Sequence, residues 1–71
     1  MKDEKYLIEL GKKIAKLRKK KDWTQVEFAE KLKIQRTAVT RIELGKINST
    51  INMLRKIAKV LDIAVDEMIK L

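Results

Sequence analysis

The sequence predicts an all-α protein of five helices without a β-sheet. The chain contains no proline, and its only glycines are Gly11 and Gly45. Asn-Gly and Asp-Gly pairs, which mark tight β-hairpins, are absent. Apolar residues recur instead every three or four positions, as they do on one face of a helix. With 71 residues, the chain is expected to form a single domain over residues 1–71.

The first helix is expected from about residue 3 to residue 20, with Asp3 as its N-cap. Its apolar stripe follows spacings of three, four and three and consists of Leu7, Leu10, Ile14 and Leu17. Between residues 12 and 21 there are seven basic residues and no acidic one. This run is either an ordinary solvated surface or a surface for nucleic-acid phosphates or a membrane.

The second helix is expected from about residue 25 to residue 32. Thr24 precedes it and Glu27 stands three positions later, which is the spacing of a capping box. Phe28, Ala29 and Leu32 then fall on one face. This helix is too short to be stable alone and must pack against neighbours.

The third helix is expected from about residue 36 to residue 44. Val39 and Ile42 form its apolar pair, and Gly45 follows at the position where helices often end with glycine. Arg36, Thr37, Thr40 and Arg41 point away from that pair. They form either a solvated face or a surface that reads bases.

Two further helices complete the chain. Ser49 or Thr50 is expected to cap a helix from about residue 51 to residue 61. Its inward residues are predicted to be Ile51, Leu54, Ile57, Ala58 and Leu61. A final helix is expected over residues 65–71, and it is more apolar than one internal face requires.

Composition excludes several functions and favours a polyanionic partner. The chain has no cysteine and no histidine, so we expect no metal site, no cofactor and no enzymatic activity. No apolar run reaches 18 residues and no signal peptide opens the chain, so a cytoplasmic protein without a membrane partner is expected. Eighteen basic and ten acidic residues give a net charge of +8, which favours binding to nucleic acid.

The segment from residue 24 to residue 45 resembles the helix-turn-helix of the phage-repressor and Cro-like (XRE) family of DNA-binding proteins. Counted from Gln25, the small fifth residue is Ala29, and the apolar fifteenth and eighteenth residues are Val39 and Ile42. The ninth position, usually a glycine with positive φ, is Lys33, which costs about 1 kcal/mol in that conformation. The resemblance covers residues 10–69 and implies a lambda-repressor-like DNA-binding domain.

The resemblance also implies roles for the polar residues. Arg36 and Thr37 are expected to reach base edges, and Thr40 and Arg41 lie one turn further on, where one is expected to reach a base and the other a phosphate. Phosphate contacts are expected from Gln25, Gln35, Lys46, Asn48 and Arg18. Arg18 is further expected to pair with Glu43 and so tie the first helix to the third; two unrelated surface charges are the alternative.

The predicted function is that of a sequence-specific transcriptional regulator on double-stranded DNA. It is expected to be of the repressor or restriction–modification controller type and to bind a palindromic operator as a homodimer. The dimer surface is assigned to the segment of about residues 62–71 and part of the preceding helix, namely Val65, Met68, Ile69, Leu71, Met53 and Val60. The alternative is an antitoxin that binds a partner toxin and regulates its own operon.

Overall fold

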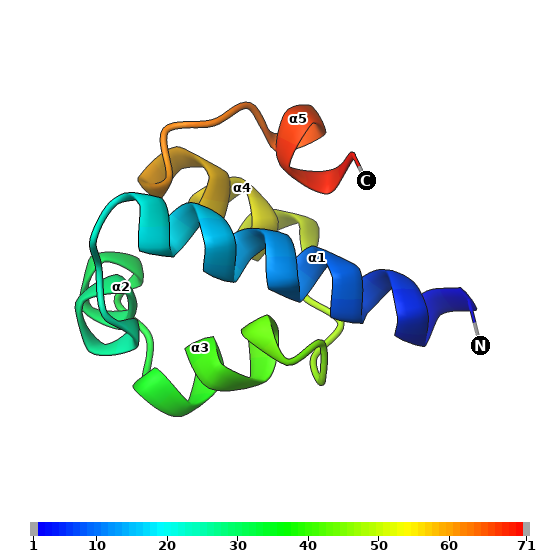
Figure 1. Ribbon diagram of the computed structural model, residues 1–71, viewed down its shortest axis with the longest axis horizontal. Coiled ribbons are helices and arrows are strands. Elements are labelled where there is room, and N and C mark those ends of the chain that lie inside the picture. The colour runs from blue at the N-terminus through cyan, green and yellow to red at the C-terminus, as the bar shows by residue number, and fades with distance from the viewer. Residues whose placement is uncertain (1, 71) are drawn as a thin grey trace.

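The computed structural model describes residues 2–70, and their side chains from residue 4 onward. It contains α1 (Lys2–Lys20), α2 (Gln25–Leu32), α3 (Arg36–Glu43), α4 (Ile51–Val60) and α5 (Val65–Ile69). No strand occurs among residues 2–70, so the predicted all-α class is confirmed. Figure 1 shows α1 crossing the middle of the molecule, with α3 on one side and α5 on the other.

The helix ends differ from the predicted ones at a few positions. Because α1 already begins at Lys2, Asp3 lies inside the helix and is not its N-cap. Leu44 and Leu61 stand just outside α3 and α4 as their C-caps. The last helix ends at Ile69.

The caps and the turn predicted around α2 are present. The Glu27 N–H donates to the Thr24 hydroxyl at 3.1 Å, and the Thr24 N–H donates to the Glu27 carboxylate at 2.8 Å. Lys33 adopts the left-handed conformation at φ 58° that the turn between α2 and α3 requires. Of the two candidate caps for α4, Thr50 is used, since its hydroxyl accepts from the Met53 N–H at 3.2 Å.

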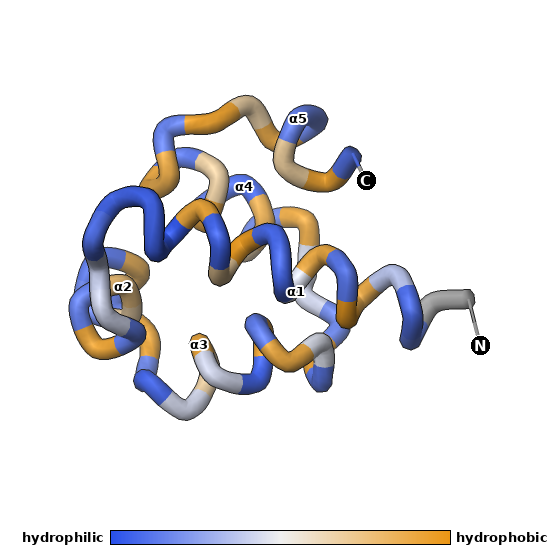
Figure 2. Tube along the Cα trace, in the orientation of Figure 1, coloured by the Kyte–Doolittle hydropathy of each residue, from blue (hydrophilic) through white to orange (hydrophobic). Residues whose placement is uncertain are grey.

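All five helices contribute to one apolar core. In Figure 2, hydrophobic and hydrophilic residues alternate along the helices, as expected when one face of each is buried. The largest fully buried side chains come from every helix and are Phe28, Ile14, Leu32, Ile57, Met68 and Val39. The core therefore holds the short α2 and α3 in place through neighbours that are distant in sequence.

Both glycines lie where α1 packs closely against the C-terminal end of α3 and the turn that follows α3. A Cβ on Gly11 would stand 2.5 Å from the carbonyl oxygens of Ile42 and Glu43. Gly45 has φ 74°, and a Cβ there would stand 2.6 Å from the backbone of Ile8. The missing side chains therefore allow α1 to pack directly against the C-terminal end of α3.

Side chains of α1 also hold α5. The Tyr6 hydroxyl donates to the Ile69 carbonyl at 2.6 Å. The Lys13 ammonium donates to the carbonyls of Glu67 and Lys70, both at 2.6 Å. These donors satisfy carbonyl groups that a helix of five residues leaves unpaired at its C-terminus.

Candidate nucleic-acid interface

The outer face of α3 gathers the residues expected to read bases. Arg36, Thr37, Thr40 and Arg41 line one shallow groove together with Leu44 and Lys46, and we call this the recognition groove. Val39 and Ile42 on the opposite face are buried. The packing of these two residues fixes the rotation of α3, so that two arginines and two threonines lie along the same surface.

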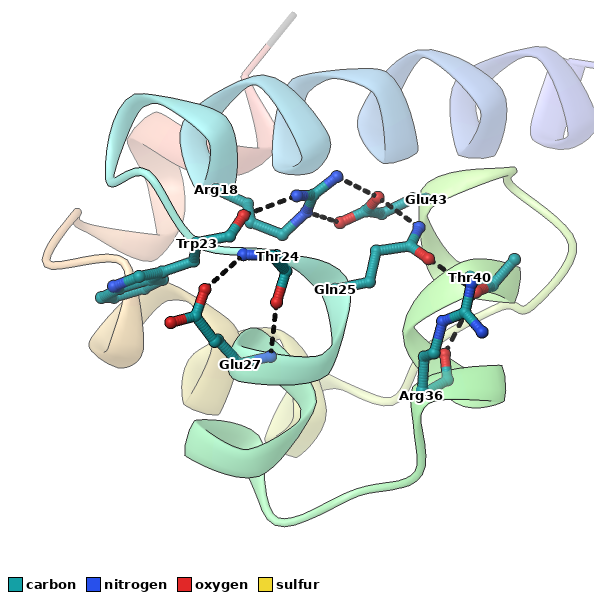
Figure 3. A network of polar contacts seen from close by, with 8 residues as sticks. All are labelled: Arg18, Trp23, Thr24, Gln25, Glu27, Arg36, Thr40 and Glu43. Carbon is teal, nitrogen blue, oxygen red and sulfur yellow. Dashed lines mark hydrogen bonds and ion pairs between the residues drawn. The ribbon is translucent and has the colours of Figure 1, made fainter.

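A buried ion pair lies directly behind this groove (Figure 3). The Arg18 Nε donates to one carboxylate oxygen of Glu43 at 2.7 Å, and Nη2 donates to the other at 3.1 Å. Arg18 Nη1 donates to the Trp23 carbonyl at 2.7 Å. The exposed fractions of Arg18 and Glu43 are only 7% and 8%. The pair joins the end of α1 to the end of α3.

Burial changes the role expected for Arg18. All three of its nitrogens already donate to protein oxygens, and almost none of its surface is exposed. A phosphate contact from Arg18 is therefore not supported, because an anion cannot approach the guanidinium without disrupting the ion pair. Arg18 is a residue that positions α3.

Gln25 connects this ion pair to the recognition groove. Its amide nitrogen donates to Glu43 Oε1 at 3.0 Å, and its amide oxygen accepts from the Thr40 hydroxyl at 3.0 Å. The Thr40 hydroxyl also lies 3.2 Å from the Arg36 carbonyl. The Gln25 side chain is thus engaged within the protein, which leaves the backbone N–H groups at the start of α2 for the expected phosphate contact. Sequence spacing does not reveal this bridge, because it depends on how α2 and α3 pack.

The other expected phosphate contacts lie around α3. Gln35 is the N-cap of α3, is exposed and makes no side-chain capping hydrogen bond. Lys46 and Asn48 are exposed in the loop after α3. Lys46 lines the recognition groove, whereas Asn48 lines a separate pocket against α1.

A second groove that the sequence did not predict lies beside the recognition groove. Four lysines of α1 line it together with residues of α2 and α3, and they are Lys12, Lys16, Lys19 and Lys20. Thr40 and Leu44 line both grooves, and Leu44 is 55% exposed. The basic run of α1 was the signal available in the sequence, but only the packing of α1 against α3 places it next to the predicted base-reading residues.

The apolar residues assigned to a dimer surface fall into three groups. Met68 is 0% exposed and belongs to the core, so its assignment to a dimer surface is wrong. Val65, Ile69, Met53 and Val60 are half-buried and pack on the core. Leu71 lies outside the described residues. Ile51, expected to face inward, is instead 58% exposed at the start of α4.

Residues 2–70 contain neither a cluster of metal-ligating side chains nor a membrane-spanning helix. No group of three or more aspartate or glutamate residues within residues 2–70 could hold a metal ion. No helix there is long and apolar enough to span a bilayer.

Comparison with known proteins places this surface in context. A family model described as helix-turn-helix matches residues 14–68. The control protein C.MunI from Mycoplasma sp is 40% identical over 62 residues, which are 86% of this chain and 84% of that protein. The transcriptional activator BcrR from Enterococcus faecalis is 34% identical over 62 residues, but the chain spans only 30% of its length.

A solved structure has a similar fold. The restriction-modification controller protein C.AhdI from Aeromonas hydrophila superimposes with a TM-score of 0.82 and 29% sequence identity. The match covers 87% of this chain and 90% of that one.

Proposed function

This chain belongs to the XRE-type helix-turn-helix family and is a DNA-binding transcriptional regulator, and on that basis we propose that it binds a palindromic operator as a homodimer. The proposal includes the roles of individual residues. Arg36 and Thr37 contact bases, and one of Thr40 and Arg41 contacts a base and the other a phosphate. Gln35, Lys46 and Asn48 contact phosphates, as do backbone N–H groups at the start of α2.

The observation that carries this proposal is the recognition groove. Its residues combine two arginines, two threonine hydroxyls and a lysine on the outer face of a helix whose inner face is buried. The major groove of DNA accepts an α-helix, and arginine can pair with both O6 and N7 of guanine. The surrounding charge supports the same partner, because the chain carries a net charge of +8.

The relatives favour a controller-type regulator. C.MunI is named a control protein and C.AhdI a restriction-modification controller protein, and this chain covers most of the length of each. We therefore propose that the chain is a transcriptional regulator of this controller type. The role of BcrR as an activator is less informative, since this chain matches 30% of it.

The proposed dimer surface lies on the side of α1 away from α3. Figure 1 places α5 and α3 on opposite sides of that helix, so a second copy that docks on α5 leaves the recognition groove free. The half-buried residues Val65, Ile69, Met53 and Val60 supply apolar area for this contact. Two recognition helices related by two-fold symmetry would then read half-sites about 34 Å apart.

Selection of bound sites from random duplex DNA tests the proposal. The expected result is a palindrome, with affinity that falls steeply as salt rises. Arg36→Ala should relax specificity at one base position and weaken binding to the preferred site by about 1–3 kcal/mol. Lys46→Ala should weaken binding to all DNA sequences about equally.

Arg55→Ala provides a matched control, because Arg55 is an exposed arginine of α4 that lines neither groove. This variant should retain both affinity and specificity. Recovery of no common motif by the wild-type protein would refute the proposed operator, and a uniform loss of affinity in Arg36→Ala would refute the assigned base contact.

A further inference from the structure

We propose that the buried Arg18–Glu43 ion pair determines, through Gln25, which bases Thr40 can read. The inference rests on the proposed binding of DNA by the recognition groove and adds a specificity rule to it. Thr40 presents only a hydrogen-bond acceptor to the DNA. Glu43 and Gln25 are positioning residues that hold the Thr40 hydroxyl in this orientation. The rule follows from which atom donates and which accepts in each hydrogen bond of the network drawn in Figure 3.

The first step is the orientation of the Gln25 amide. The carboxylate oxygens of Glu43 are acceptors, and Arg18 already donates to both of them at 2.7 and 3.1 Å. At 3.0 Å from Glu43 Oε1, only the amide nitrogen of Gln25 makes a favourable contact. Rotation of the amide by 180° would place its oxygen against the carboxylate. The amide oxygen is therefore directed towards Thr40.

The second step is the position of the Thr40 hydrogen. A threonine hydroxyl has a single hydrogen to donate. The two protein atoms within reach of it are the amide oxygen of Gln25 at 3.0 Å and the carbonyl oxygen of Arg36 at 3.2 Å, and both are acceptors. The hydrogen is thus directed towards the protein, and Gln25 supplies the nearer of the two acceptors. The remaining lone pairs of the hydroxyl oxygen are left for a ligand in the groove.

The third step is what these lone pairs can recognise. In the major groove, adenine presents the N6 amine and cytosine the N4 amine, both of which donate. Guanine and thymine present O6 and O4 at the equivalent place, and both of these are acceptors. Thr40 therefore favours adenine or cytosine at the base it faces and disfavours guanine or thymine.

The chain of hydrogen bonds is fixed before DNA arrives. Arg18 and Glu43 are buried, so water does not compete for the carboxylate at the start of the chain. Gln25 and Thr40 are half-buried, and Thr40 lines the recognition groove at its other end. The polarity of an exposed contact is thus controlled by charges in the interior of the protein.

The experiment compares base preference rather than affinity. Binding is measured for all single-base variants of the selected operator. Thr40→Val, which keeps the side-chain shape but removes the hydroxyl, identifies the base position that Thr40 faces. At that position the wild-type protein should prefer adenine or cytosine over guanine or thymine by about tenfold. Gln25→Ala should reduce this ratio to about threefold or less, because the hydroxyl then keeps only the longer contact to the Arg36 carbonyl at 3.2 Å and can turn to donate to a base.

Three further variants complete the test. Gln25→Met gives the same comparison with nearly the original side-chain volume, in case the alanine variant folds poorly. Thr40→Ser keeps the hydroxyl and should retain the preference. Arg55→Ala removes an exposed side chain of α4 that takes no part in the network and lines neither groove, and it should leave the preference unchanged.

Two outcomes would overturn the inference. If Thr40→Val changes the preference at no position, Thr40 does not read a base. If the Gln25 variants keep a preference that Thr40→Val abolishes, the ion pair does not control it. Both outcomes differ from failure of the proposed function, in which the wild-type protein would select no operator at all.

Discussion

Arg18 is a basic residue of a lysine-rich helix that contributes almost nothing to the basic surface. Its guanidinium is surrounded by acceptors from Glu43 and Trp23 and lies within the protein. Burial of such a pair removes both charges from water, which costs desolvation energy. The attraction between the two charges offsets this cost only when their geometry is good. The two-pronged geometry meets that condition, so removal of one partner should be much worse than removal of both.

A double-mutant cycle tests this dependence. Arg18→Ala should lower the free energy of unfolding by about 3–5 kcal/mol, because Glu43 is left buried without a countercharge. The double variant Arg18→Ala, Glu43→Ala should lose clearly less than the sum of the two single variants. Urea denaturation measures all three, with Lys19→Ala as an exposed control expected to change stability by less than about 0.5 kcal/mol. Strict additivity would show that the two residues are not coupled.

The capping box predicts that the stability of the protein depends on the protonation of Glu27. Hydrogen bonds from the Thr24 backbone N–H and then its side chain, with a smaller contribution from Lys31, hold the pKa of Glu27 below its ordinary value of 4.5. A lowered pKa in the folded state means that the stabilisation is complete above pH 4.5 and is lost as pH falls through the lower folded value. At neutral pH, the free energy of unfolding should therefore be higher for the wild-type protein than for the Glu27→Gln variant. This difference should shrink below pH 4.5.

Thermal denaturation over a pH series measures this difference. Glu30→Gln is the matched control, because Glu30 is an exposed acid of the same helix whose side chain takes part in neither cap. A gap between wild type and Glu27→Gln that stays constant down to low pH would refute the role assigned to the carboxylate.

At the scale of the helices, the contact between α1 and α3 decides where the recognition groove lies. Gly11 brings the α1 backbone within reach of the Ile42 and Glu43 carbonyls, and Gly45 allows the chain to leave α3 beside Ile8. These two contacts, together with the ion pair, fix the C-terminal end of α3 relative to α1. The rotation and tilt of the recognition helix are consequently set by residues that do not face DNA.

Gly11→Ala is expected to reveal this constraint. Alanine is normally favoured over glycine inside a helix by about 1 kcal/mol. Here its Cβ would stand 2.5 Å from two backbone carbonyl oxygens, so overpacking should reverse the sign and cost about 1–3 kcal/mol. Operator affinity should fall as well, because α3 must move. Calorimetry and binding assays measure the two effects, and Lys12→Ala, one position further along α1, should cause neither loss of stability nor displacement of α3.

Local signals made the helices predictable from sequence, whereas the contacts between helices were not. The capping box at Thr24 depends on neighbouring residues and is indicated by their spacing alone, whereas the left-handed turn at Lys33 is implied by the resemblance to the helix-turn-helix family. The bridge from Gln25 to Thr40 and the burial of Met68 depend on packing between distant segments. Helical periodicity placed Met68 on an apolar face but did not indicate that the core would cover it.

At the scale of the whole molecule, the proposed DNA and partner surfaces lie on opposite sides of α1. The recognition groove and the lysine-lined groove share Thr40 and Leu44 on the α3 side. Helix α5, which carries the half-buried Val65 and Ile69, lies on the other side. One recognition helix reads only a few base pairs, so a second copy is needed for useful specificity in a genome.

Ile69→Glu tests the assignment of the dimer surface. A carboxylate on α5 should prevent docking of a second copy, and operator affinity should fall while the far-ultraviolet helical signal persists. Sedimentation velocity over a range of concentrations measures the association. Val26→Glu is the control, since Val26 is an exposed apolar residue of α2, and this variant should still dimerise. Sedimentation of Ile69→Glu as a dimer would exclude α5 from the interface.

The way α5 is attached favours its detachment before the rest of the molecule unfolds. A helix of five residues has little stability of its own, and α5 relies on Tyr6 and Lys13 to satisfy its carbonyls at 2.6 Å. Release of α5 requires loss of those three hydrogen bonds and withdrawal of Met68 from the core, while the contacts of α1 and α2 with α3 can persist. This makes α5 a candidate for sub-global unfolding. If α5 carries the dimer contact, that local fluctuation and dissociation of the dimer are linked equilibria. The protein would then lose its partner at a lower free energy than it loses its fold.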